Sequence, residues 1–158
     1  FLPMSIGLHS KSVSARGAAH LQDRTGWFID GFAERKWRAN VTLDRSSYYT
    51  NGQWIESNEV AMPDVAVYRA TFGWQREAWC IPVGLTSQRT LGGGDIRRQD
   101  MPFVSNRMNF TAAHAELMYY LPRLAGLRLD LGAAYTLSGR NVGQSTTIMT
   151  GLTYAFHL

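Results

Sequence analysis

His114 and Glu116 have the residue types and the spacing that acid–base chemistry requires. They lie two positions apart, so a β-strand would place both side chains on one face, close enough to share a proton. The same pair is typical of a polar protein interior, because a buried charged group needs a hydrogen-bonding partner. The interior interpretation is the more common of the two. We therefore expect no catalytic site, and His114 and Glu116 are the candidates if one exists.

The other reactive residues form no recognisable site. The four histidines and the single cysteine, Cys80, are dispersed, which gives no metal-ligand spacing and no intramolecular disulfide. His9 and His20 lie outside any G-x-S-x-G nucleophile motif, and the glycine run at 92–94 lacks the Lys-Ser/Thr of a phosphate-binding loop. The net charge is +4, but the basic residues are scattered singly. We expect no metal, no cofactor and no nucleic-acid partner.

The elements that must position these residues are β-strands. Apolar and polar residues alternate with a period of two along much of the chain, and helical periodicity is almost absent. The clearest case is 127–137, where the odd-numbered residues are apolar and the even-numbered ones include Arg128 and Asp130. Pro82 cannot donate to a strand ladder, so we expect a bulge there. The remaining alternating segments are 36–44, 68–74, 79–85, 112–121, 147–158 and, less clearly, 2–12 and 15–24.

This pattern predicts an all-β fold: an antiparallel up-and-down transmembrane β-barrel of about eight strands, forming a single domain over 1–158. No apolar run approaches the roughly 18 residues of a transmembrane helix, so a membrane would be crossed by strands. The expected connections alternate between long and short, as in outer-membrane barrels. Long loops are expected at 45–63 and 88–106, a moderate one at 139–144, and short turns at 75–76 and 122–123.

Two further sets of residues fit this arrangement. The polar faces carry charges of mixed sign, which would pair with one another and fill a narrow lumen: Arg38, Asp44, Arg69, Glu116, Arg128 and Asp130. The strand ends beside the short turns carry aromatic residues, which are enriched at membrane interfaces: Phe72, Trp74, Trp79, Tyr119, Tyr154 and Phe156.

The chain ends in the alternating segment Tyr154-Ala155-Phe156-His157-Leu158. In this the whole chain resembles bacterial outer-membrane β-barrel proteins as a class, with Leu158 in place of the usual terminal Phe. The resemblance implies a location in the bacterial outer membrane and contact with its lipid and lipopolysaccharide. It also implies recognition of the C-terminal strand by the barrel-assembly machinery.

These observations favour a non-enzymatic outer-membrane barrel with a structural or partner-binding role, whose loops at 45–63 and 88–106 face outward. One alternative is a channel or a subunit of a transport assembly, which would need more strands or a partner chain. Others are a lipid-modifying barrel enzyme acting through His114 and Glu116, and a soluble lipocalin-like barrel with its apolar face inside. The start at Phe1 suggests a mature protein or a piece of a longer one, so the chain is a complete barrel or the C-terminal part of a larger one.

Overall fold

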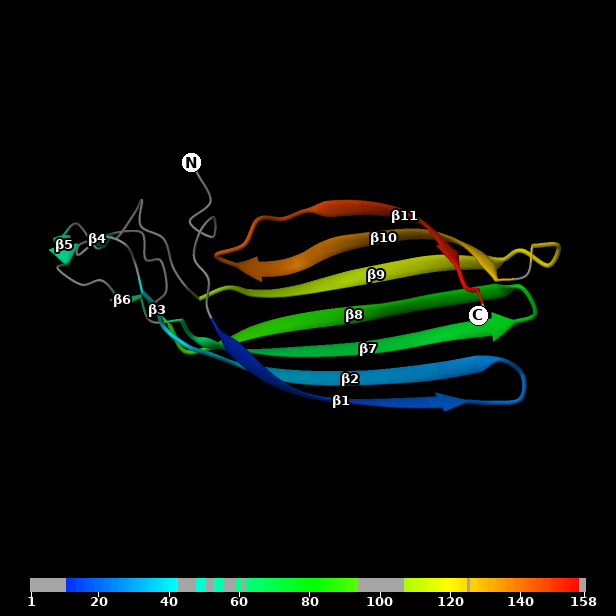
Figure 1. Cartoon of the computed structure of the whole chain (residues 1–158), viewed down its shortest axis with the longest axis horizontal. Helices are drawn as coiled ribbons and strands as arrows, with labels where there is room; N and C mark the ends of the chain where they lie inside the picture. The colour runs from blue at the N-terminus through cyan, green and yellow to red at the C-terminus, as the bar shows by residue number, and fades with distance from the viewer. Residues whose placement is uncertain are drawn as a thin grey trace.

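The computed structural model describes residues 11–42, 48–50, 53–55, 59–60, 62–93, 107–124 and 126–156. Seven of its strands form one antiparallel sheet in the order β1-β2-β7-β8-β9-β10-β11, so each long strand pairs with the next one along the chain (Figure 1). The predicted all-β, up-and-down arrangement is confirmed. Within the described ranges, no helix is long and apolar enough to cross a membrane. The sheet strands are β1 (Ser12–Gln22), β2 (Trp27–Arg38), β7 (Asp64–Arg76), β8 (Trp79–Leu91), β9 (Asn109–Tyr120), β10 (Leu127–Arg140) and β11 (Thr146–Tyr154).

Four short strands lie in the connection between β2 and β7. β3 (Val41–Thr42) pairs with β6 (Glu59–Val60), and β4 (Tyr48–Thr50) pairs with β5 (Gln53–Ile55). They form two small two-stranded sheets beyond one end of the main sheet (Figure 1). The expected long loop at 45–63 therefore contains hairpin structure.

The first five connections between the long strands alternate between short and long, as predicted. The predicted order of a short turn and then a moderate loop is wrong at the end of the chain, because 121–126 has six residues and 141–145 has five. Three connections, 23–26, 77–78 and 121–126, join strands at one end of the sheet, which we name the turn end. The other three, 39–63, 92–108 and 141–145, lie at the opposite end, which we name the loop end. The turn expected at 75–76 comes two residues later, where Glu77 has a φ of 53°.

The strand predicted over 36–44 is wrong, because β2 begins at Trp27 and ends at Arg38. Phe28 and Phe32 lie on the otherwise polar face of β2, while Gly31 and Ala33 lie on its apolar face. This mixture hides the alternation that marks the other strands. The loop expected at 88–106 is also too long at its start, since β8 continues to Leu91.

The bulge expected at Pro82 does not occur. Pro82 stands opposite Gly73 in an unbroken register with β7. On the β9 side, the register passes over Pro82 unchanged, from Cys80 opposite Met118 to Val83 opposite Ala115. The register shift lies instead in β10, between Thr136 and Ser138.

Among the described residues, β1 and β11 each pair with a strand on one side only, so the main sheet is not closed there. The predicted strand over 2–12 lies almost entirely outside the described residues, as does Asp44. Both edge strands run from the loop end to the turn end, because the sheet contains an odd number of alternating strands, seven in all.

Candidate functional site: the two faces of the sheet

One face of the sheet, here named the outer face, carries most of its large apolar side chains. The register places Ile29 opposite Phe72, and Phe72 opposite Val83, so the apolar surface is continuous from strand to strand. These three side chains are 56%, 53% and 51% exposed. Further exposed apolar residues on the same face are Val13, Leu21, Trp27, Trp37, Tyr68, Trp79, Ile81, Leu85, Leu129, Leu131, Tyr135, Leu137, Ile148, Leu152 and Tyr154.

The opposite face, here named the inner face, is more polar and, from β2 to β10, more buried. Thr71, Cys80 and Thr136 are all buried there. In the described part of the chain each long strand contacts only its neighbours in the sheet, so no second layer covers this face. The burial therefore comes from side chains of the sheet itself, as on the concave side of a curved sheet.

Glycines on the inner face make room for larger side chains of neighbouring strands. A Cβ at Gly73 would overlap the ring of Phe28. A Cβ at Gly84 would lie 2.9 Å from the ring of His114, closer than real Cβ contacts. Each glycine is thus covered by a ring from the adjacent strand, and the inner face is packed by interlocking residues.

The inner face holds an ion pair near the turn end, between Arg128 and Asp130. Nε of Arg128 lies 2.7 Å from Oδ1 of Asp130, and the hydroxyl of Thr153 donates to Oδ2 of Asp130 at 3.2 Å. The guanidinium carbon of Arg128 also lies 5.7 Å from the centroid of the Tyr120 ring. β9, β10 and β11 therefore each contribute one part of this cluster.

His114 and Glu116 lie on the inner face of β9, as the spacing predicts for a strand, but they are not hydrogen-bonded to each other. The ring of His114 covers Gly84 of β8, while the Glu116 side chain lies against Gly132 of β10, where a Cβ would be 3.3 Å from it. The two side chains thus lean towards opposite neighbours. Both act as space-filling residues in this geometry.

The remaining predicted inner charges lie apart from the Arg128 pair. Nε of Arg69 donates to the hydroxyl of Thr86 at 3.3 Å. At the loop end, Nε of Arg38 donates to the carbonyl of Pro63 at 2.7 Å, and its backbone N–H donates to the Asp64 carboxylate at 3.2 Å. Arg38 therefore connects the end of β2 to the start of β7 through hydrogen bonds.

The sequence analysis missed a second inner-face pair, His20 with Asp30. Nδ1 of His20 lies 2.5 Å from Oδ1 of Asp30, and the two residues stand opposite each other on β1 and β2. The segment Asp23–Gly26 is a hairpin turn, in which Gly26 has a φ of 99°. Recognition of this turn in the sequence would have placed His20 and Asp30 on opposed strands.

The predicted interface aromatics gather at the turn end. Phe72, Trp74, Trp79, Tyr119 and Tyr154 lie on the outer face, and Phe156 is exposed just beyond β11. The rings of Trp79 and Tyr119 are 4.4 Å apart between centroids. Trp27, which the sequence analysis did not single out, joins this row by stacking on Phe72 at 5.0 Å.

The described residues contain no group of three or more His, Cys, Asp or Glu side chains that could hold a metal ion. No protein-family model, curated protein or solved structure matches the chain. The two faces of the sheet therefore provide the basis for assigning a function.

Proposed function

We propose that this chain is an outer-membrane β-barrel protein with a structural or partner-binding role. The single observation that carries the proposal is the exposed apolar outer face opposite an inner face that is more polar and, from β2 to β10, more buried. Soluble proteins rarely expose a contiguous apolar patch larger than a few hundred Å². Lipid removes that penalty, and transmembrane barrels alternate apolar-out and polar-in along each strand.

The height of the outer face supports contact with a bilayer. Trp27 and Trp37 lie ten residues apart on the outer face of β2. A strand rises about 3.4 Å per residue, so the two indole rings are about 34 Å apart along the strand. With a strand tilt of about 40°, this separation becomes about 26 Å along the membrane normal, close to the roughly 25 Å apolar band of such barrels.

The strand count supports closure by one more strand. β1 and β11 run in the same direction, so an antiparallel barrel needs an additional strand running opposite to both. The sequence before Ser12 has the required pattern, since Leu2, Met4, Ile6 and Leu8 alternate with smaller residues. In our proposal this segment is the eighth strand.

The alternatives receive different support. A lipocalin-like barrel would enclose its apolar side chains, whereas here the apolar face is the more exposed one and the face that carries Arg128, Asp130 and His114 is the more buried. A lipid-modifying enzyme would need His114 and Glu116 within reach of a lipid, and both lie on the face opposite the apolar one. The second candidate is a larger barrel or a subunit of a transport assembly. The additional strands of either would also pair with the backbone groups of β1 and β11 at the sheet edges.

Heat-modifiable electrophoretic mobility tests the proposal. The chain would be refolded in detergent micelles and run on a gel with and without boiling. A closed barrel resists the detergent, so we expect the unboiled band to migrate faster. Identical bands would overturn the proposal that this chain closes by itself and would favour the larger barrel. A chain that stays folded and monomeric in detergent-free buffer would overturn the membrane assignment.

A further inference from the structure

The outer face has a groove near the loop end, over β1, β2 and β7. Ala15, Gly17, Ala33, Tyr68 and Leu91 line it, and it is a shallow depression, open to the outside, with a volume of about 520 Å³. A Cβ at Gly17 would meet no atom within 4 Å. The inner-face glycines are covered by neighbouring rings, whereas the space above Gly17 is left open.

The lining of the groove suits a flexible hydrocarbon chain. Its side chains on the outer face are methyl groups, an isobutyl group and a phenol ring, with a single charged group, Arg35, at the loop end. The small residues let a ligand approach the backbone closely. An acyl chain could therefore lie along the groove in van der Waals contact, with its polar end towards Arg35.

The strand register places two arginines near the loop end of the groove. Arg35 on β2 and Arg89 on β8 stand on either side of Ala66 on β7, in the same row of the sheet. Ala66 is only 4% exposed although it lies on the outer face. Two strand spacings separate the two backbones, about 10 Å, so the long side chains could converge on one anion above Ala66.

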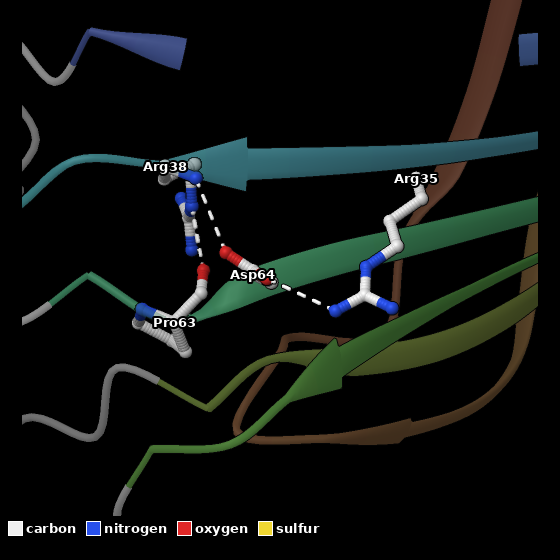
Figure 2. Close-up of polar contacts among 4 residues, drawn as sticks. All are labelled: Arg35, Arg38, Pro63 and Asp64. Carbon is white, nitrogen blue, oxygen red and sulfur yellow. Dashed lines mark hydrogen bonds and ion pairs between the residues drawn. The ribbon is translucent and has the colours of Figure 1, made fainter. Parts of the chain in front are cut away.

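Arg35 is held in position but keeps donors available. Its guanidinium lies 3.3 Å from the Asp64 carboxylate and 5.2 Å from the Trp37 ring centroid, and the side chain is still 54% exposed. Figure 2 shows Arg35 reaching from β2 towards Asp64, whose other oxygen accepts the backbone N–H of Arg38. Arg35 and Arg89 together therefore exceed the charge of Asp64 by one positive unit.

We propose, on the basis of the membrane function proposed above, that this groove binds a lipid whose headgroup carries a phosphate monoester. The acyl chain would lie over Gly17 and Ala33, and the phosphate would be held between Arg35 and Arg89. A monoester carries close to two negative charges at neutral pH, and guanidinium groups match phosphate oxygens with paired hydrogen bonds. Arg35 lies eight residues from Trp27, about 21 Å along the membrane normal at a 40° tilt. Its backbone is therefore about 5 Å inside the loop-side edge of the apolar band, from where a long arginine side chain can reach the headgroups.

Native mass spectrometry from detergent micelles tests this site, with phosphatidic acid as the monoester probe and phosphatidylglycerol as the diester comparison. We expect the wild-type chain to retain one phosphatidic acid molecule in preference to phosphatidylglycerol. The variant Arg35→Gln/Arg89→Gln should retain roughly tenfold less, because two charge-assisted contacts are lost. The matched charge control is Arg76→Gln/Arg123→Gln at the turn end, which also removes two positive charges and should retain lipid as the wild type does.

A second pair of variants tests the groove itself. Gly17→Leu should fill the acyl path and reduce retention. Gly31→Leu is its control, because Gly31 also opens onto empty space but does not line the groove. Equal retention by all variants, or retention of free phosphate as well as lipid, would overturn the lipid site. Dimers of the chain in which the groove is covered would also overturn the lipid site, because the groove would then bind a second copy of the chain. The unboiled gel shift, run on the same samples, reports separately whether the barrel itself has formed.

Discussion

At the residue scale, the glycines on the two faces of this sheet have different surroundings. Gly73 and Gly84 on the inner face are covered by rings of adjacent strands, whereas Gly17 and Gly31 on the outer face have open space above them. The inner glycines let neighbouring side chains cross over the backbone and fill the inner face. The same substitution should therefore have different consequences on the two faces.

Gly73→Ala tests the inner-face packing. The added methyl would overlap the ring of Phe28, and overpacking of this kind costs about 1–3 kcal/mol. Urea unfolding of the refolded protein should show that loss, and Phe28→Leu in the same chain should restore part of it. Gly17→Ala is the control, and it should be neutral or slightly stabilising, since alanine is favoured over glycine within a strand by about 0.5–1 kcal/mol. Equal destabilisation by both alanine variants would contradict the packing of Phe28 over Gly73.

Asp23 makes the first turn sensitive to acid. The Thr25 hydroxyl donates to its carboxylate at 2.7 Å, and the backbone N–H groups of Thr25 and Trp27 donate at 2.9 Å. These bonds, with that of the Thr25 hydroxyl largest, hold the pKa of Asp23 below its usual range. Folding therefore favours the ionised form of Asp23. The ionised carboxylate stabilises the folded state fully above the ordinary aspartate pKa, and this contribution is lost as the pH falls through the lower pKa of Asp23 in the folded state.

The comparison of wild type with Asp23→Ala measures this effect. At neutral pH the variant should unfold at a lower urea concentration, and the difference should shrink as the pH is taken below the ordinary aspartate pKa. Thr25→Val removes the hydroxyl but keeps the carboxylate. In the Thr25→Val background, the stability difference that Asp23→Ala causes should be smaller than in the wild type over the same pH range. A difference that is independent of pH would exclude the ionised carboxylate as its cause.

At the element scale, the sequence predicted the strands whose two faces differ clearly. β10 alternates from Leu127 to Leu137, and its inner residues Arg128 and Asp130 were placed correctly on one face. β2 was misplaced because aromatic residues occur on both of its faces. The groove and the glycine contacts depend on which residues stand opposite each other on different strands. That register depends on where the turns lie and on which strands pair. The alternation of residues within a single strand gives no information about either.

A charge on the outer face of β10 tests which solvent that face meets. Leu131 is exposed midway along the outer face, and Leu131→Arg should destabilise the chain by about 2–4 kcal/mol when it is folded in bilayers. Leu137→Arg, closer to the loop end of the same strand, should cost about 0–1 kcal/mol because the arginine can reach the headgroups. Equilibrium unfolding from lipid vesicles gives both values. If Leu131→Arg were neutral, the outer face would not be in hydrocarbon.

At the scale of the whole molecule, the direction of the edge strands determines how the sheet can close. β1 and β11 both run towards the turn end, so joining them directly would make one parallel pair in an otherwise antiparallel sheet. A strand running the other way satisfies both edges with antiparallel ladders. Such a strand also covers the unpaired backbone groups, which hydrocarbon does not tolerate.

Disulfide trapping identifies that strand. In a Cys80→Ser background, one cysteine would replace Leu2, Met4, Ile6 or Leu8, and a second would replace Ile148, Thr150 or Leu152 on the outer face of β11. Residues opposite each other on antiparallel strands have Cβ atoms about 4.5–5.5 Å apart, close to disulfide geometry. We expect a subset of pairs, sharing one register, to oxidise within a single chain, as seen by mass and by non-reducing mobility. Crosslinks that form only between chains would assign the closing strand to a second copy. The absence of any crosslink, with a folded chain, would place β11 beside strands of a larger barrel.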